Sequence, residues 1–124
     1  MLKVPLERYF CEEIEEMPEE CSFDFKAPTF WLEIKGREAR YRSDDRYAEK
    51  GWWIGYPKVL ACKGEKQMDV YFIYYFESDK TTWLLKYEKG LFDRFVPFAN
   101  AQGQLTIAVP KSYWTQISLQ LSSP

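Results

Sequence analysis

The chain has no histidine. This absence excludes Ser-His-Asp and Cys-His catalysis, a histidine general base and histidine-bound zinc, unless a partner supplies the residue. The three cysteines, Cys11, Cys21 and Cys62, lack C-x-x-C spacing and are odd in number, so they indicate neither a zinc site nor a set of disulfides. Enzyme chemistry would have to use carboxylates, Lys, Tyr, Ser or Cys. Oxygen ligands alone suit Mg²⁺ or Mn²⁺ rather than zinc or copper.

Long apolar runs are absent too. No window approaches the roughly 18 consecutive apolar residues that a membrane-spanning helix needs. Together with the unpaired cysteines, this pattern predicts a soluble protein of the cytoplasm with no membrane partner. With 124 residues, we expect a single domain over residues 1–124. A chain of this length buries about two-thirds of its unfolded surface, which is enough to hold a core without staples.

The net charge of −2 is unevenly distributed. The first 20 residues contain seven Glu and two basic residues, a net −5, so the rest of the chain carries +3. Residues 35–42 alone carry +3, because four basic side chains face only Glu38. Such a segment would attract phosphates, and a solvated loop balanced by the acids that follow it is the alternative. The four basic residues are Lys35, Arg37, Arg40 and Arg42.

Aromatic side chains make up 19% of the sequence. A β-rich core accommodates such rings well, and we expect most of them there. The alternative is a set of exposed rings on which nucleic-acid bases stack.

The apolar spacing predicts most of the elements. Apolar residues at positions 6, 10, 14 and 17 predict an amphipathic helix over 5–17 that ends before Pro18. The apolar run within 69–77 is typical of a buried central strand, and 81–87 returns beside it. We therefore expect an α+β fold, three-layer-like, with an N-terminal helix followed by a central mixed or antiparallel sheet. Further predictions are a loop over 36–51 with a helical turn over 44–50, short strands over 58–62 and 105–109, and a helical turn over 91–95.

Two alternating runs bring acidic residues close together. Asp24 lies in the run 21–26, and Glu33-Ile34-Lys35 ends the run 30–35. Alternation along a strand places Glu33 and Lys35 on one face and Ile34 on the other. The runs are close enough for a hairpin. If its loop is the two residues Pro28-Thr29, Asp24 stands across from Glu33 with the Cβ atoms about 5 Å apart.

Two carboxylates facing each other across a hairpin repel, and this destabilises an ordinary sheet. A hard divalent cation between their oxygens makes the same arrangement favourable. The hairpin therefore predicts a Mg²⁺ or Mn²⁺ site at Asp24 and Glu33. The alternative is a solvent-facing hairpin in which Lys35 pairs with one of the two acids, because E-x-K triplets are common in surface strands.

Asp24 followed at close range by a strand ending in Glu33-Ile34-Lys35 resembles the signature of the PD-(D/E)XK nuclease superfamily. The segment 107–114 is also similar to the closing segment of small phage-type relatives. The resemblance covers nearly the whole chain, but only the Asp and E-x-K positions are specific. The chain departs from the family pattern at Phe23, where the family often has proline. A strand usually lies between the family's first helix and its Asp strand, and the interval after Met17 is barely long enough for it.

The resemblance implies a restriction-endonuclease-like core and a metal-dependent nuclease that hydrolyses phosphodiester bonds. Asp24 and Glu33 would hold Mg²⁺ or Mn²⁺, the Ile34 carbonyl would add a ligand, and Lys35 would orient or deprotonate the attacking water. Family members often carry an acid on the first helix, which makes Glu7 the expected further metal ligand and Glu13 the alternative.

The implied partner is nucleic acid, with DNA expected ahead of RNA, bound in part by Arg37, Arg40 and Arg42. A homodimer is implied by resemblance only, and the location would be the host cytoplasm if the protein is viral. The alternative belongs to a different class: a non-catalytic binding or inhibitory module, with a phage origin as one option, that contacts protein or nucleic acid.

Overall fold

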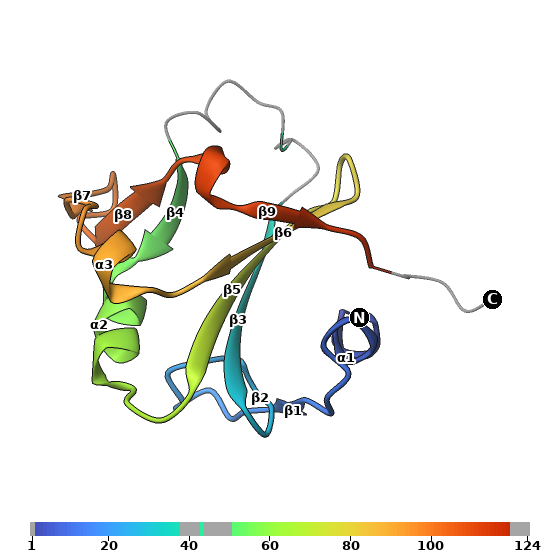
Figure 1. Ribbon diagram of the computed structural model, residues 1–124. Helices are drawn as coiled ribbons and strands as arrows, with labels where there is room; N and C mark the ends of the chain where they lie inside the picture. The colour runs from blue at the N-terminus through green and yellow to red at the C-terminus, as the bar shows by residue number, and fades with distance from the viewer. Residues whose placement is uncertain (1, 38–42, 44–50, 120–124) are drawn as a thin grey trace.

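The computed structural model describes residues 2–37, 43 and 51–119. Over these residues the protein is α+β, with an N-terminal helix, a mixed six-stranded sheet and a small antiparallel sheet of three strands (Figure 1). Two more α-helices follow the first. None of the described helices is long and apolar enough to cross a membrane.

The elements follow in chain order. The helices are α1 (Lys3–Phe10), α2 (Tyr56–Gly64) and α3 (Lys89–Phe92), with a 3₁₀ helix at Lys111–Tyr113. The strands are β1 (Glu15–Glu16), β2 (Phe25–Lys26), β3 (Phe30–Arg37), β4 (Trp52–Gly55), β5 (Asp69–Phe76), β6 (Thr81–Lys86), β7 (Phe98–Ala99), β8 (Leu105–Val109) and β9 (Thr115–Ile117).

The large sheet has the order β1-β2-β3-β5-β6-β9, and the small sheet has the order β4-β8-β7. β3 and β5 are parallel, in register from Phe30 opposite Asp69 to Arg37 opposite Phe76, whereas the other neighbours are antiparallel. Parallel neighbours need a long crossover, and this one contains β4 and α2. The predicted mixed sheet is confirmed, with β5 inside it and β6 returning beside β5. The strand predicted over 105–109 is confirmed as β8 of the small sheet.

Each face of the large sheet carries its own hydrophobic cluster. α1 and α2 lie on opposite sides of the β3–β5 pair (Figure 1). Leu6 of α1 packs with Leu32, Ile34 and Ile73 on one face. Trp31 packs on the other face, in the cluster that includes α2 and the small sheet. Alternation therefore places the side chains of β3 on two different sides, as strand geometry requires.

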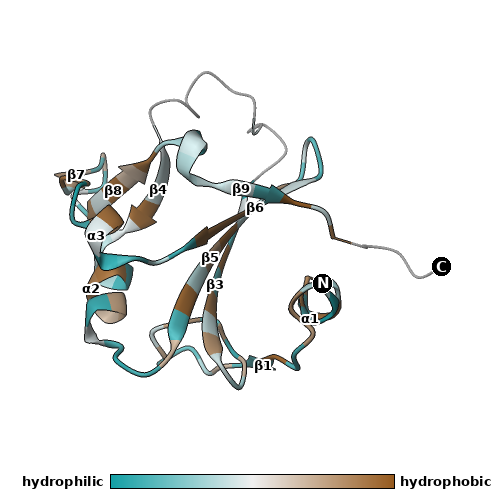
Figure 2. Cartoon of the chain, in the orientation of Figure 1, coloured by the Kyte–Doolittle hydropathy of each residue, from teal (hydrophilic) through white to brown (hydrophobic). Residues whose placement is uncertain are grey.

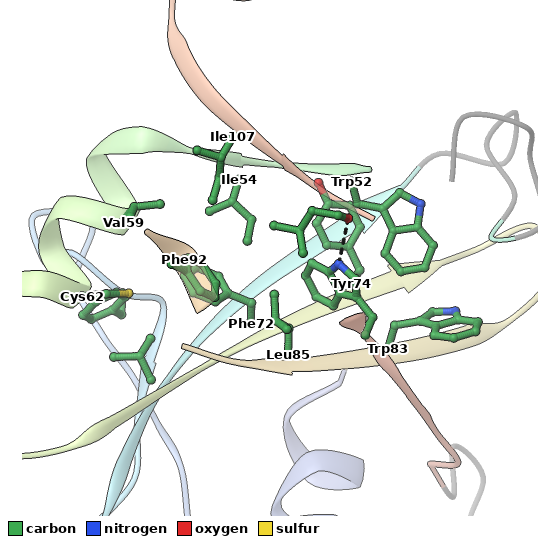
Figure 3. Packing of buried hydrophobic residues seen from close by; sticks show 14 of the residues in the cluster. Trp52, Ile54, Val59, Cys62, Phe72, Tyr74, Trp83, Leu85, Phe92 and Ile107 are labelled. Carbon is green, nitrogen blue, oxygen red and sulfur yellow. Dashed lines mark hydrogen bonds between the residues drawn. The ribbon is translucent and has the colours of Figure 1, made fainter. Parts of the chain in front are cut away.

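The aromatic residues join the small sheet to the large one. Trp52 of β4 lies 4.8 Å from the Phe76 ring, 5.6 Å from the Tyr74 ring and 5.4 Å from the rings of Trp83 and Trp114. Figure 3 shows the labelled rings of β4, β5 and β6 gathered in this layer. Each such ring pair contributes about 0.5–1.5 kcal/mol beyond its buried area. Figure 2 shows apolar stretches along these strands and polar residues at the β5–β6 turn. At these positions the expected core role of the aromatics is confirmed.

The helix predicted over 5–17 is wrong in its second half. α1 ends at Phe10, because Cys11 adopts a left-handed conformation with φ of 58°. Ile14 still enters the core beside Leu6, but it does so from an extended segment that continues into β1. The Glu7 carboxylate accepts a hydrogen bond from the Ile14 N–H at 2.8 Å and holds this turn. The apolar residues of 11–17 therefore have helical spacing in the sequence, although this part of the chain is not helical.

The strand predicted over 58–62 is also wrong, because these residues lie in α2. Pro57 in the first turn favours a helix start. Val59 and Cys62, three residues apart, are the buried residues of this helix. The helical turn over 91–95 is confirmed in its position by α3. The turn predicted over 44–50 lies outside the described residues.

Candidate functional site

The β2–β3 hairpin has the register that the sequence predicts. Phe25 pairs with Leu32 and Lys26 with Trp31. The Ala27 N–H donates to the Phe30 carbonyl at 2.8 Å, which leaves a loop of two residues, 28–29. Continuing this register by one pair places Asp24 opposite Glu33.

Asp24 lies just beyond the β2–β3 ladder. Its side chain, and not its backbone, makes the next hydrogen bond to β3. Its Oδ2 accepts a hydrogen bond from the Ile34 N–H at 2.9 Å, and its carbonyl accepts one from Met17 at 2.9 Å. The N–H and C=O of one residue point to the same side of an extended strand. The Ile34 carbonyl therefore faces the edge at which the Asp24 carboxylate lies. The structure thus brings Asp24, Glu33 and the Ile34 backbone together.

The Glu33 side chain is largely buried and forms an ion pair. Its side chain is 19% exposed, and its Oε2 lies 3.3 Å from the Nζ of Lys58. Its Oε1 is buried and has no hydrogen-bond partner among the described residues. Burial and the nearby Asp24 carboxylate raise the pKa of Glu33, while Lys58 and the Asp24 backbone oppose this rise. A buried carboxylate oxygen without a partner, beside a second carboxylate, is a local excess of negative charge.

Lys58 is the site residue that sequence reasoning missed. It lies in the first turn of α2, and its ammonium group contacts Glu33 and also donates to the Ser22 carbonyl. Because the sequence predicts a strand over 58–62, it does not place the Lys58 side chain near the carboxylates. The available signal was Pro57 followed by apolar residues at helical spacing, which together indicate a helix beginning near Tyr56.

Lys35 and Arg37 continue along β3 beyond Glu33. Alternation places all three on one face of the strand. Burial and the neighbouring Arg37 lower the pKa of Lys35, while the Glu33 carboxylate opposes this effect. The Arg37 guanidinium lies 5.9 Å from the centre of the Tyr74 ring, a distance typical of a cation–π contact. The other two predicted nucleic-acid-binding residues, Arg40 and Arg42, lie outside the described residues.

The structure does not bring Glu7 or Glu13 to the carboxylate pair. Glu7 belongs to α1, which packs on the opposite face of the sheet, and its carboxylate already caps the Ile14 N–H. Glu13 is exposed in the segment after α1. Within the described ranges, no group of three or more Cys, Asp or Glu side chains is close enough together to hold a metal ion. The acid expected from the first helix is therefore missing from this site.

The α2 side of the site is apolar. Cys62 is only 2% exposed and packs in the cluster that contains Val59 and Phe72 (Figure 3). Burial and the nearby Glu33 carboxylate raise the pKa of the Cys62 thiol to about 12. An apolar environment strengthens electrostatic interactions. The charges of Glu33 and Lys58 consequently act on each other more strongly here than they would in water.

The site thus consists of the carboxylates of Asp24 and Glu33, the backbone carbonyl of Ile34, and two lysines. Lys35 lies on β3, and Lys58 lies on α2. Hard oxygen ligands of this kind are the ones that Mg²⁺ and Mn²⁺ prefer. The buried Oε1 of Glu33 has no hydrogen-bond partner among the described residues and lies near the Asp24 carboxylate. A bound cation would stabilise this arrangement, whereas two carboxylates without a cation would repel each other. Comparisons with protein-family models, with the sequences of curated proteins and with solved structures find no match to this chain.

Proposed function

We propose that the protein is a metal-dependent nuclease that hydrolyses phosphodiester bonds of nucleic acid, with DNA as the first substrate to test. Asp24, Glu33 and the Ile34 carbonyl would hold a Mg²⁺ or Mn²⁺ ion. The observation that carries the proposal is the buried Oε1 of Glu33, which lies near Asp24 and has no hydrogen-bond partner in the part of the chain that the structure describes. Because burying an uncompensated carboxylate oxygen is costly, a site of this form is expected to have a ligand.

The arrangement of elements supports the finer proposal of a restriction-endonuclease-like core. A short strand, β1, lies between the N-terminal helix and β2, which begins directly after Asp24, and the resemblance implies a strand at this place. The E-x-K segment lies on β3, inside a mixed sheet. The missing acid on the first helix argues for a metal site with fewer protein ligands, in which water completes the coordination.

In this proposal, the cation, Lys35 and Arg37 have distinct roles. The bound cation would supply positive charge for the phosphate group and would acidify water. Lys35, whose pKa is lowered by burial and by Arg37, would orient the attacking water by donating a hydrogen bond as the ammonium group, or would accept its proton as the neutral amine. Arg37 would contribute charge that attracts the phosphodiester backbone. Water adds to phosphorus, one P–O ester bond breaks, and the products are a phosphomonoester and a hydroxyl.

The test is cleavage of plasmid and of single-stranded, duplex and branched oligonucleotides in Mg²⁺ and in Mn²⁺. We expect Asp24→Asn, Glu33→Gln and Lys35→Ala each to reduce the rate by about 100-fold or more, since each removes a group acting at the reacting atoms. Asp69→Asn is the matched control, because Asp69 is an exposed acid at the start of β5 that pairs with Lys86. If the folded Glu33→Gln variant cleaves as fast as Asp69→Asn, the proposed site is wrong.

A second candidate function is favoured by one observation. Lys58 already neutralises part of the Glu33 charge, so the carboxylate pair is partly stabilised without a metal. A non-catalytic module that binds protein or nucleic acid would need such stabilisation, because it would hold no metal ion at the two carboxylates. Calorimetric titration with MnCl₂ separates the two functions, because the binding module predicts negligible heats for the wild type and for Glu33→Gln alike.

A further inference from the structure

Lys58 occupies a position that the proposed reaction does not use. Its Nζ lies 3.3 Å from Glu33 Oε2, and the same ammonium group donates to the Ser22 carbonyl. It therefore links α2 to β3 and to the segment that leads into Asp24. Its side chain is 34% exposed, so the contact is partly shielded from water.

The position of this ammonium group creates a competition. A divalent cation held by Asp24 and Glu33 would share the Glu33 carboxylate with Lys58 and would lie within a few ångströms of its positive charge. Charge–charge interactions over such distances near a protein surface exceed the net worth of a single hydrogen bond. Repulsion from Lys58 should therefore outweigh the benefit that Lys58 brings by orienting Glu33.

We propose that Lys58 is the resident counter-ion of the Asp24–Glu33 pair and that its charge sets the affinity of this pair for divalent cations. This inference rests on the proposed function, since it concerns the same metal site. In the metal-free protein, Lys58 contacts Glu33 and the Ser22 carbonyl, two residues before Asp24, and its charge partly offsets that of the two carboxylates. When the cation binds, Lys58 gives up or shares its contact with Glu33, which keeps the metal exchangeable instead of permanently bound.

The balance of charges agrees with this role. Asp24 and Glu33 contribute two carboxylates, whereas Lys58 contributes one ammonium group, which contacts Glu33. One lysine therefore does not neutralise the pair. Residual negative charge next to the orphaned Oε1 leaves room for a further cation.

The test is calorimetric titration of MnCl₂ into the wild type, Lys58→Met, Lys58→Arg and Lys63→Met. Lys63 is the matched control, because it lies on the same helix but pairs with Asp93 at 3.5 Å, away from the carboxylates. We expect Lys58→Met to bind Mn²⁺ at least tenfold more tightly than the wild type, which is about 1.4 kcal/mol. Lys58→Arg keeps the charge and should stay within about threefold of the wild type, as should Lys63→Met.

A second measurement guards against a variant that fails to fold. In EDTA, Lys58→Met should melt at a lower temperature than Lys63→Met, and Mn²⁺ should raise its melting temperature more than that of the wild type, since a ligand that binds only the folded state stabilises it. Lys58→Gln provides an alternative neutral side chain if the methionine variant is insoluble. Adding Glu33→Gln to either neutral variant should abolish the binding.

The outcomes separate the two proposals. Equal or weaker Mn²⁺ binding by folded Lys58→Met, with binding by the wild type, would overturn the counter-ion role and leave the metal site intact. No binding by any variant would overturn the metal site itself. Binding by Lys58→Met alone would support the counter-ion role and would mean that the native protein excludes the cation, in agreement with the binding module.

Discussion

The behaviour of single side chains on the α2 face follows from burial more than from charge. Glu33, Lys58 and Cys62 come from two elements and share one partly apolar environment. Burial raises the pKa of Glu33 and of Cys62 because it disfavours the anion in both cases. The same environment makes Lys58 valuable, since it is the positive charge that contacts Glu33.

Cysteine reactivity tests this environment. At pH 8, we expect iodoacetamide to modify exposed Cys11 and to leave Cys62 unmodified until the protein is unfolded. The thiolate is the reactive form, and a thiol pKa of about 12 leaves very little of it at this pH. Mass spectrometry of tryptic peptides measures both sites in one sample. Equal labelling rates for the two cysteines in the native protein would contradict the described position of Cys62.

At the scale of elements, backbone geometry limits what can stand at the start of β4. Gly51 has φ of +119°, and a Cβ at this position would lie 2.7 Å from the carbonyl carbon of Ala108 and from the Val109 nitrogen. Both atoms belong to the backbone of β8, which pairs with β4. The small sheet therefore depends on a glycine here, where the chain enters β4 against the backbone of β8.

Gly51→Ala should destabilise the protein by at least about 2 kcal/mol, because it combines a strained φ with a backbone clash. Gly64→Ala is the control, since a Cβ there meets nothing within 4 Å. In urea unfolding, the control should be neutral or up to about 1 kcal/mol more stable, because alanine lowers the entropy of the unfolded chain. If the Gly51→Ala variant is as stable as the wild type, β4 and β8 are not packed as described.

Local pattern was enough for some elements and not for others. The alternation around Asp24 and Glu33 was sufficient to predict the hairpin. Its register followed on the condition of a two-residue loop, because register in a hairpin is set by turn length, and the structure meets that condition. The apolar spacing that suggested a longer first helix was misleading, since Ile14 reaches the same core by an extended path. The contact of Lys58 with Glu33 spans a crossover, and a tertiary contact of this kind has no local signal.

At the scale of the whole molecule, β5 connects two clusters that lie on opposite faces of one sheet. Ile73 packs toward α1, whereas Phe72 and Tyr74 pack toward α2 and the small sheet. Neither cluster keeps its packing surface if β5 leaves the sheet. We therefore expect the two faces to unfold together, although the fold contains two sheets.

This expectation is tested by urea unfolding followed with two probes. Trp52, Trp83 and Trp114 lie in one cluster, so tryptophan fluorescence reports mainly on that face. Far-UV circular dichroism reports on all the helices and strands, including α1 on the other face. Coincident transitions are the expected result. A fluorescence change at lower urea concentration than the dichroism change would indicate that the small sheet detaches first.

The two carboxylates of the candidate site differ in how firmly the backbone holds them. Glu33 lies in the middle of the parallel ladder between β3 and β5, which extends on both sides of it. Asp24 lies past the end of the β2–β3 ladder and is held by its contacts with Ile34 and Met17. The backbone of Glu33 is thus fixed by the sheet, whereas the backbone of Asp24 can shift more easily. If ions of different radius bind there, the distance between the carboxylates would adapt through movement of the Asp24 segment, with β3 serving as a rigid reference.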